Sequence, residues 1–104
     1  MIRKASVMKV FPGYFEEYKR RHDELWPEMH DLLKEYGAHN YSIFLDEDTG
    51  NLFAYLEIES EEKWAEISKT KTCRLWWEYM KDIMDVNPDS SPKSKELKEV
   101  FYLK

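Results

Sequence analysis

The sequence predicts an α+β domain whose helices lie on one face of an antiparallel sheet. Two neighbouring segments, 38–45 and 52–58, show the side-chain alternation of β-strands and are joined by a short turn, which is typical of a hairpin. Segments before and after this hairpin carry apolar residues at helical spacing. The 104 residues fit one domain, 1–104, and leave no room for a second.

The chain before the hairpin predicts one strand and two helical segments. The strand is expected at Ile2–Val10, which contains β-branched residues and ends before a Pro-Gly pair. A helix follows at Tyr14–Arg21 and stops or kinks near Trp26, because Pro27 lacks the N–H of a helix interior and disfavours helical angles in the residue before it. Pro27 suits the first turn of the second segment, and Gly37 is expected just past its end.

The hairpin is expected to turn at 46–51, with Gly50 at the position of positive φ. Its two strands then pair directly. Strict alternation in the first strand places His39, Tyr41, Ile43 and Leu45 on one face and Ala38, Asn40, Ser42 and Phe44 on the other.

The chain after the hairpin predicts a helical region and a closing strand. Ser60 is a good N-cap for a short helix, and a longer helix is expected from about Thr72. Residues 87–94 contain two prolines and no apolar residue, so we expect a loop there. The apolar residues 100–103 are expected to form the last strand.

The resulting order is strand, helix, strand, strand, helix, strand, which is the ferredoxin-like βαββαβ arrangement. Both helical layers then cover one face of the sheet. The opposite face is not polar enough for water, and a chain this short buries a limited core by itself. We therefore expect a homodimer in which two sheets pack face to face as a dimeric α+β barrel.

Composition excludes several classes of protein. The net charge is −5 and the basic residues are interspersed with acids, so no basic stripe indicates a nucleic-acid partner. The single cysteine, Cys73, allows no internal disulfide and favours a buried structural thiol. No segment reaches the ~18 apolar residues of a membrane span or resembles a signal-peptide core, so we expect a cytoplasmic location without membrane contact.

Tyr18 and His22 are the first candidate site residues. They lie one helical turn apart, on one face of the same helix. A phenol beside an imidazole combines a hydrogen-bonding group with a group that exchanges protons near neutral pH. The helix break at Trp26 could form the mouth of a pocket, although the same pattern also fits the edge of an ordinary amphipathic helix.

Trp76 and Trp77 are the second candidate pair. Adjacent residues on a helix point about 100° apart, so both cannot face the core. Either one packs in the core and the other caps its edge, or both form an aromatic wall that suits the C–H faces of a sugar ring. His30 is expected in solvent, and His39 begins a strand near Tyr41. No His-Glu-x-x-His spacing or Gly-rich loop indicates a metal or phosphate site.

Several motifs along the chain resemble one known family, that of L-rhamnose mutarotase. They are Tyr-Lys-Arg-Arg-His at 18–22, Gly-Ala-His-Asn-Tyr-Ser-Ile at 37–43, Trp-Trp-x-Tyr-Met at 76–80, Asn-Pro-Asp-x-Ser-Pro at 87–92 and Leu-x-Glu-Val-Phe-Tyr-Leu at 97–103. The resemblance implies an isomerase that interconverts the α and β anomers of L-rhamnose, as a homodimer without metal or organic cofactor. It also implies that His22 is the proton donor. The residues it implies in sugar contact are Tyr18, Tyr41, Trp76 and Trp77.

The chemistry of mutarotation agrees with these residue types. Ring opening needs a proton at the ring oxygen and removal of one from the anomeric hydroxyl, and a group titrating near pH 7 can do both. The base partner of His22 is not identified by the sequence. Two alternatives stay open: a cofactor-independent monooxygenase or haem-handling protein on the same barrel, and a non-catalytic sugar-binding module.

Overall fold

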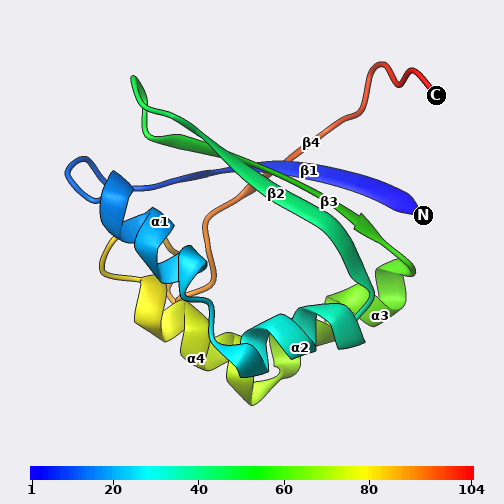
Figure 1. The fold of residues 1–104 in the computed structure, drawn as a ribbon, viewed down its shortest axis with the longest axis horizontal. Helices are drawn as coiled ribbons and strands as arrows, with labels where there is room; N and C mark the ends of the chain where they lie inside the picture. The colour runs from blue at the N-terminus through cyan, green and yellow to red at the C-terminus, as the bar shows by residue number, and fades with distance from the viewer.

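Four antiparallel strands form one layer of the molecule, and the computed structural model describes all residues 1–104 (Figure 1). The strands are β1 (Ile2–Lys9), β2 (Ala38–Asp46), β3 (Asn51–Ile58) and β4 (Lys95–Leu97). Their order across the sheet is β2-β3-β1-β4, so the first and third strands pair at the centre. This is the predicted ferredoxin-like topology.

All the helices lie on one side of this sheet (Figure 1). They are α1 (Phe15–Asp23), α2 (Pro27–Glu35), α3 (Glu61–Ala65), the 3-10 helix η1 (Glu66–Lys69) and α4 (Lys71–Met80). As predicted, the chain breaks between α1 and α2, and Pro27 is the first residue of α2. With ten residues, α4 is much shorter than the ~20 residues that cross a bilayer, and no helix is long and apolar enough to do so.

Side-chain caps define where the later helices begin. The Ser60 hydroxyl accepts a hydrogen bond from the Lys63 amide at 3.2 Å, as its predicted role requires. The Thr70 hydroxyl accepts from the Cys73 amide at 3.3 Å. Because Thr70 is the cap, α4 begins at Lys71, one residue before the expected start at Thr72.

The core fills the space between sheet and helices. Its most completely buried side chains are Leu52, Ile58, Met80, Ile83 and Val10. Cys73 on α4 packs in the same cluster, which confirms the predicted buried thiol. The hairpin also follows the prediction at Gly50, whose φ is +79° and where a Cβ would lie 2.7 Å from the Val10 carbonyl.

The predicted alternation of β2 is wrong at its first residue. The register with β3 shifts between His39 and Ser42, and Asn40 adopts a positive φ of 50°. Such a bulge inserts an extra residue and changes which residues share a face. Ala38 therefore packs in the core against Leu33 of α2, on the helix side of the sheet, instead of sharing a face with Phe44 as predicted.

The predicted closing strand is also misplaced. The last strand is β4, where Leu97 pairs with Ala5 of β1, and residues 100–103 form no strand although their apolar composition favours one. The chain has by then left the edge of the sheet (Figure 1), so these residues have no strand to pair with. Val100 is 88% exposed and Tyr102 is 54% exposed.

The outer face of the sheet carries apolar side chains and no helix. Phe44 of β2 and Phe53 of β3 are directly paired there, and Phe44 is 70% exposed. The structure thus confirms the predicted uncovered apolar face, while the second copy expected to cover it stays a prediction.

Candidate active site

A cavity of about 1560 Å³ lies between the sheet and the helices. It is larger than the ~300–1,000 Å³ of typical small-molecule sites, so a monosaccharide would occupy only part of it. All five site residues named from the sequence line this one cavity: Tyr18 and His22 from α1, Tyr41 from β2, and Trp76 and Trp77 from α4. The fold therefore brings together residues from three separate segments of the chain.

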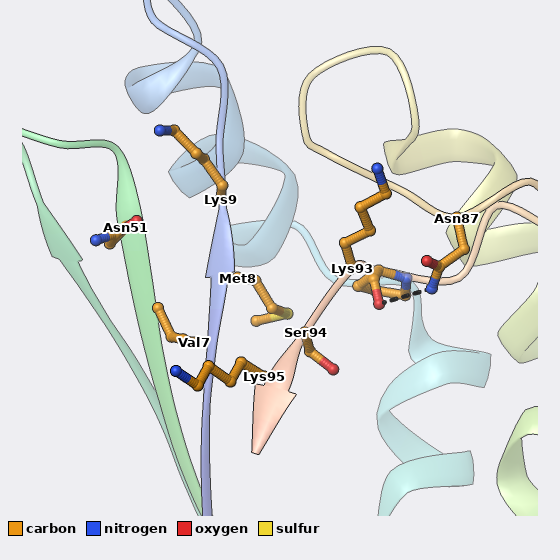
Figure 2. Close-up of a pocket in the computed structure, with 9 residues that line it drawn as sticks. Val7, Met8, Lys9, Asn51, Asn87, Lys93, Ser94 and Lys95 are labelled. Carbon is orange, nitrogen blue, oxygen red and sulfur yellow. Dashed lines mark hydrogen bonds between the residues drawn. The ribbon is translucent and has the colours of Figure 1, made fainter. Parts of the chain in front are cut away.

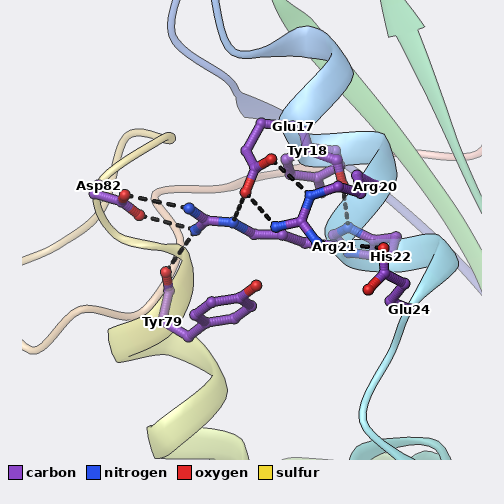
Figure 3. Close-up of polar contacts among 8 residues, drawn as sticks. All are labelled: Glu17, Tyr18, Arg20, Arg21, His22, Glu24, Tyr79 and Asp82. Atoms are coloured by element: carbon purple, nitrogen blue, oxygen red, sulfur yellow. Dashed lines mark hydrogen bonds and ion pairs between the residues drawn. The ribbon is translucent and has the colours of Figure 1, made fainter.

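His22 and Tyr18 share one face of α1, as predicted. Their rings stack with centroids 4.4 Å apart and an angle of 27° between planes. The Nδ1 of His22 lies 3.0 Å from the Tyr18 carbonyl oxygen (Figure 3). A carbonyl only accepts, so Nδ1 carries the hydrogen and Nε2 has the free lone pair in the neutral ring.

The Nε2 atom of His22 makes no hydrogen bond within the protein. No fully buried side-chain nitrogen or oxygen lacks a partner, so Nε2 keeps accessible surface, which the cavity provides. Burial lowers the pKa of His22 below its ordinary value of 6.5, and the Tyr18 carbonyl and Asp23 only partly oppose this shift. At neutral pH the imidazole is therefore mostly uncharged and can accept a proton at Nε2.

The two tyrosines offer uncharged hydroxyl groups to the same cavity. Burial, with a smaller contribution from Tyr41, raises the pKa of Tyr18. Burial also raises the pKa of Tyr41, which lines the cavity from β2. Tyr18 makes no side-chain hydrogen bond in the protein, so its hydroxyl is free to bind a ligand.

The two tryptophans differ in environment, as the sequence indicates for adjacent aromatic residues. Trp76 is buried in the core, where it meets His22 edge to face at 5.5 Å and Trp26 at 5.0 Å. Trp77 is half-buried, with the Arg74 guanidinium 6.0 Å from its ring. Both nevertheless line the cavity, so an aromatic wall and a core role are compatible for Trp76.

The remaining histidines and the single cysteine lie in environments that differ from that of His22. His30 is exposed, as predicted, with Nδ1 3.2 Å from Asp31. The Nε2 of His39 is 2.7 Å from a carboxylate oxygen of Glu59, so this ring already has a partner. Burial raises the pKa of Cys73 to about 11, which makes its thiol a poor nucleophile.

Two groups of residues were not identified from the sequence. Asp89 and Ser91 line the cavity from the loop 87–94, which the sequence marked as polar, rich in proline and part of a family motif, with no role for either residue. Arg21 is buried beside His22 and contacts Asp82. No sequence pattern indicated that contact, because the two residues lie on elements distant in the chain.

A second, shallower depression of about 470 Å³ lies beside β1 and β4 (Figure 2). Its lining includes Lys9, Lys93 and Lys95. None of the five site residues lines it, although it adjoins the aromatic cavity and shares Met8 and Asn87 with that lining.

Comparison with known proteins gives a consistent result over the whole chain. The model of the family described as L-rhamnose mutarotase matches residues 3–103. An L-rhamnose mutarotase of Tolumonas auensis is 62% identical over 103 residues, covering 99% of both chains. A crystal structure of an L-rhamnose mutarotase from Formosa agariphila is 44% identical, with a TM-score of 0.92 and complete coverage of both chains.

More distant structures share the fold alone. A dimeric ferredoxin-like protein from an uncultured marine organism aligns with a TM-score of 0.67 at 14% identity, covering 99% of both chains. A putative antibiotic biosynthesis monooxygenase from Nitrosomonas europaea aligns at 0.64 and 14% identity, covering 95% of this chain and 89% of that one. At such identities the monooxygenase likeness concerns the fold and not the chemistry.

Proposed function

Because this chain belongs to the L-rhamnose mutarotase family, we propose that its aromatic cavity binds L-rhamnopyranose and interconverts the α and β anomers there. The chain is an L-rhamnose mutarotase, and we assign it to the isomerases. His22 is the proton-transfer residue of this proposal, and Tyr18, Tyr41, Trp76 and Trp77 form the sugar site.

Ring opening in this cavity needs one proton to move between two oxygens on the same carbon. The anomeric hydroxyl loses its proton as its oxygen becomes a carbonyl, the bond from the anomeric carbon to the ring oxygen breaks, and the ring oxygen gains a proton. Rotation about the neighbouring carbon–carbon bond presents the other carbonyl face, and the reverse steps close the ring. The number of protons is unchanged over the cycle.

His22 is suited to carry that proton in both directions. The neutral ring accepts the anomeric proton at Nε2, and the resulting imidazolium donates it to the ring oxygen, which is the predicted role of proton donor. The hydrogen bond from Nδ1 to the Tyr18 carbonyl persists in both protonation states and fixes the ring orientation. A separate base partner for His22 is unnecessary, because both oxygens are bonded to one carbon.

The other residues account for sugar binding. The faces of Trp76 and Trp77 provide apolar surface for ring C–H groups and for the methyl group of a 6-deoxy sugar. The Tyr18 and Tyr41 hydroxyls stay protonated and can donate or accept hydrogen bonds to sugar hydroxyls. A sugar with a hydroxymethyl group would lack a polar partner at the apolar surface.

The free Nε2 of His22 in the cavity is the single observation that carries this proposal. Saturation-transfer NMR on equilibrated L-rhamnose tests it directly. We expect the protein to speed the exchange of magnetisation between the two anomers well above the spontaneous rate. Binding without such a rate effect would instead support the sugar-binding module.

We also propose that two copies assemble through the outer face of the sheet. Phe44 and Phe53 provide exposed apolar surface there, and large exposed apolar surfaces indicate interaction sites. The distant ferredoxin-like neighbour described as dimeric supports the same assembly.

A further inference from the structure

Arg21 is the most deeply placed charged residue near the site, with only 10% of its side chain exposed. Its side chain extends from α1 toward α4, and all three guanidinium nitrogens donate hydrogen bonds (Figure 3). Its Nε donates to Glu17 at 2.7 Å, and Nη1 and Nη2 donate to the two Asp82 oxygens at 2.9 and 3.2 Å. Nη1 also donates to the Tyr79 carbonyl at 2.7 Å.

These contacts join two helices that carry different parts of the site. Glu17 lies one turn earlier on α1, whereas Tyr79 is in the last turn of α4 and Asp82 follows that helix. The last carbonyls of a helix have no intrahelical partner, and Arg21 satisfies the one at Tyr79. Arg21 therefore fixes the C-terminal end of α4 against α1, beside His22.

A chain of aromatic contacts links the same arginine to the far side of His22. The guanidinium lies 4.4 Å from the centre of the Tyr79 ring. That ring contacts Trp76 at 5.5 Å between centroids, and Trp76 meets the His22 ring edge to face at 5.5 Å. His22 is thus held through its own backbone neighbour and through the Trp76 ring that it packs against.

We propose that Arg21 is a positioning residue for mutarotation, which aligns His22 on α1 with the tryptophans on α4. The inference rests on the proposed function, and it adds a role that neither the family resemblance nor the cavity lining indicates. Arg21 itself does not line the cavity, so it acts through His22 and Tyr79 and not on the sugar.

Energetics favour positioning over simple stabilisation. Asp82 is 63% exposed on its side chain, and pairs with such exposed partners contribute little net stability. The planar guanidinium instead fixes the directions of its hydrogen bonds, because its donors form a rigid fork that a lysine ammonium lacks. Small displacements of a catalytic group can cost about 10²-fold in rate.

The test compares Arg21→Lys, which retains the charge and loses the planar guanidinium, with Arg20→Lys on the same helix. Arg20 pairs with Glu17 and Glu24 and its side chain is 49% exposed, so the same substitution there keeps a charge beside Glu17 and is the matched control. In anomer-exchange NMR at saturating sugar, we expect kcat to fall about tenfold in Arg21→Lys. KM should change less than kcat, and Arg20→Lys should leave both unchanged.

The pKa of His22 gives a readout that a purely structural role would not change. Loosening of α1 from α4 hydrates the imidazole, so histidine NMR should show its pKa rising toward 6.5 in folded Arg21→Lys. The groups that face His22, namely Asp23, Tyr18 and Trp76, and the positive charge at position 21 are all retained in this variant. Hydration is therefore the only expected cause of the shift.

Asp82→Asn gives a second test if Arg21→Lys fails to fold, because Asp82 is largely exposed. We expect kcat to fall less in Asp82→Asn than in Arg21→Lys, and circular dichroism confirms the fold. Wild-type kcat in folded Arg21→Lys, or a loss that only follows the unfolded fraction, overturns the positioning role. His22→Ala is measured alongside: if it retains the wild-type rate, the proposed role of His22 fails instead.

Discussion

The rings of His22 and Trp76 meet edge to face, with their centroids 5.5 Å apart and their planes at 88°. His22 lies on α1 and Trp76 on α4, on opposite sides of the β2–β3 hairpin in the chain. The contact adds no hydrogen bond to the imidazole, so Nε2 stays available in the cavity. This geometry underlies the following predictions.

His22→Ala should lower the enzyme-catalysed exchange of L-rhamnose anomers by about 10²–10⁴-fold, the usual contribution of one general acid–base group. Saturation-transfer NMR at matched protein concentration measures the rate, and circular dichroism checks folding. His30→Ala is the control, since His30 is exposed and contacts only the neighbouring Asp31. Exchange at the wild-type rate in His22→Ala would assign proton transfer to another group.

The catalysed rate should fall at acid pH, with a midpoint below 6.5. Burial lowers the pKa of His22, so the neutral ring that accepts the anomeric proton predominates at pH 7 and is lost as the pH drops through that lowered value. Rates at a series of pH values, after subtraction of spontaneous exchange, give the profile. A catalysed rate that increases toward acid pH would contradict the starting role of Nε2 as base.

L-rhamnose binding should change the tryptophan fluorescence of the native protein, because Trp76 and Trp77 both line the cavity. Replacing both by Phe retains apolar surface but reduces its area, so we expect weaker sugar binding. Fluorescence or NMR titration with L-rhamnose measures the affinity. Normal binding and turnover in the double variant would remove the tryptophans from the sugar site.

Phe44→Ser should shift the protein from homodimer to monomer in sedimentation experiments at micromolar concentration, because Phe44 is exposed on the uncovered face of the sheet. Leu75→Ser is the matched control, since Leu75 is an exposed apolar residue on α4 in the helical layer. A stable monomer for the unaltered protein would contradict assembly through this face.

The exposed apolar residues 100–103 should contribute to the same association. A chain ending at Leu97 keeps β4 and its pairing with β1 but loses this tail. We expect it to remain folded and to dissociate more readily than the full chain in the same sedimentation assay. Unchanged dimer stability would show that the tail has no part in the interface.

Local rules explain why much of the fold follows from the sequence. Pro27 separates α1 from α2 because of its missing N–H, and Gly50 turns the hairpin at a positive φ of 79°, which glycine adopts without strain. Helical periodicity alone places Tyr18 and His22 on one face, as the 4.4 Å ring stack confirms. These features depend on residues that are close together in the chain.

Residues distant in the chain decided the features that the sequence did not predict. The bulge at Asn40 moves Ala38 into the core, and β4 forms at Lys95–Leu97 because that is the segment that meets the free edge of β1. The bond from Arg21 to Asp82 likewise needs α1 and α4 to pack together. The sequence by itself determined the residue types of the site, whereas tertiary packing alone excludes water from His22, lowers its pKa and leaves Nε2 free to act, since desolvation depends on neighbours from every element.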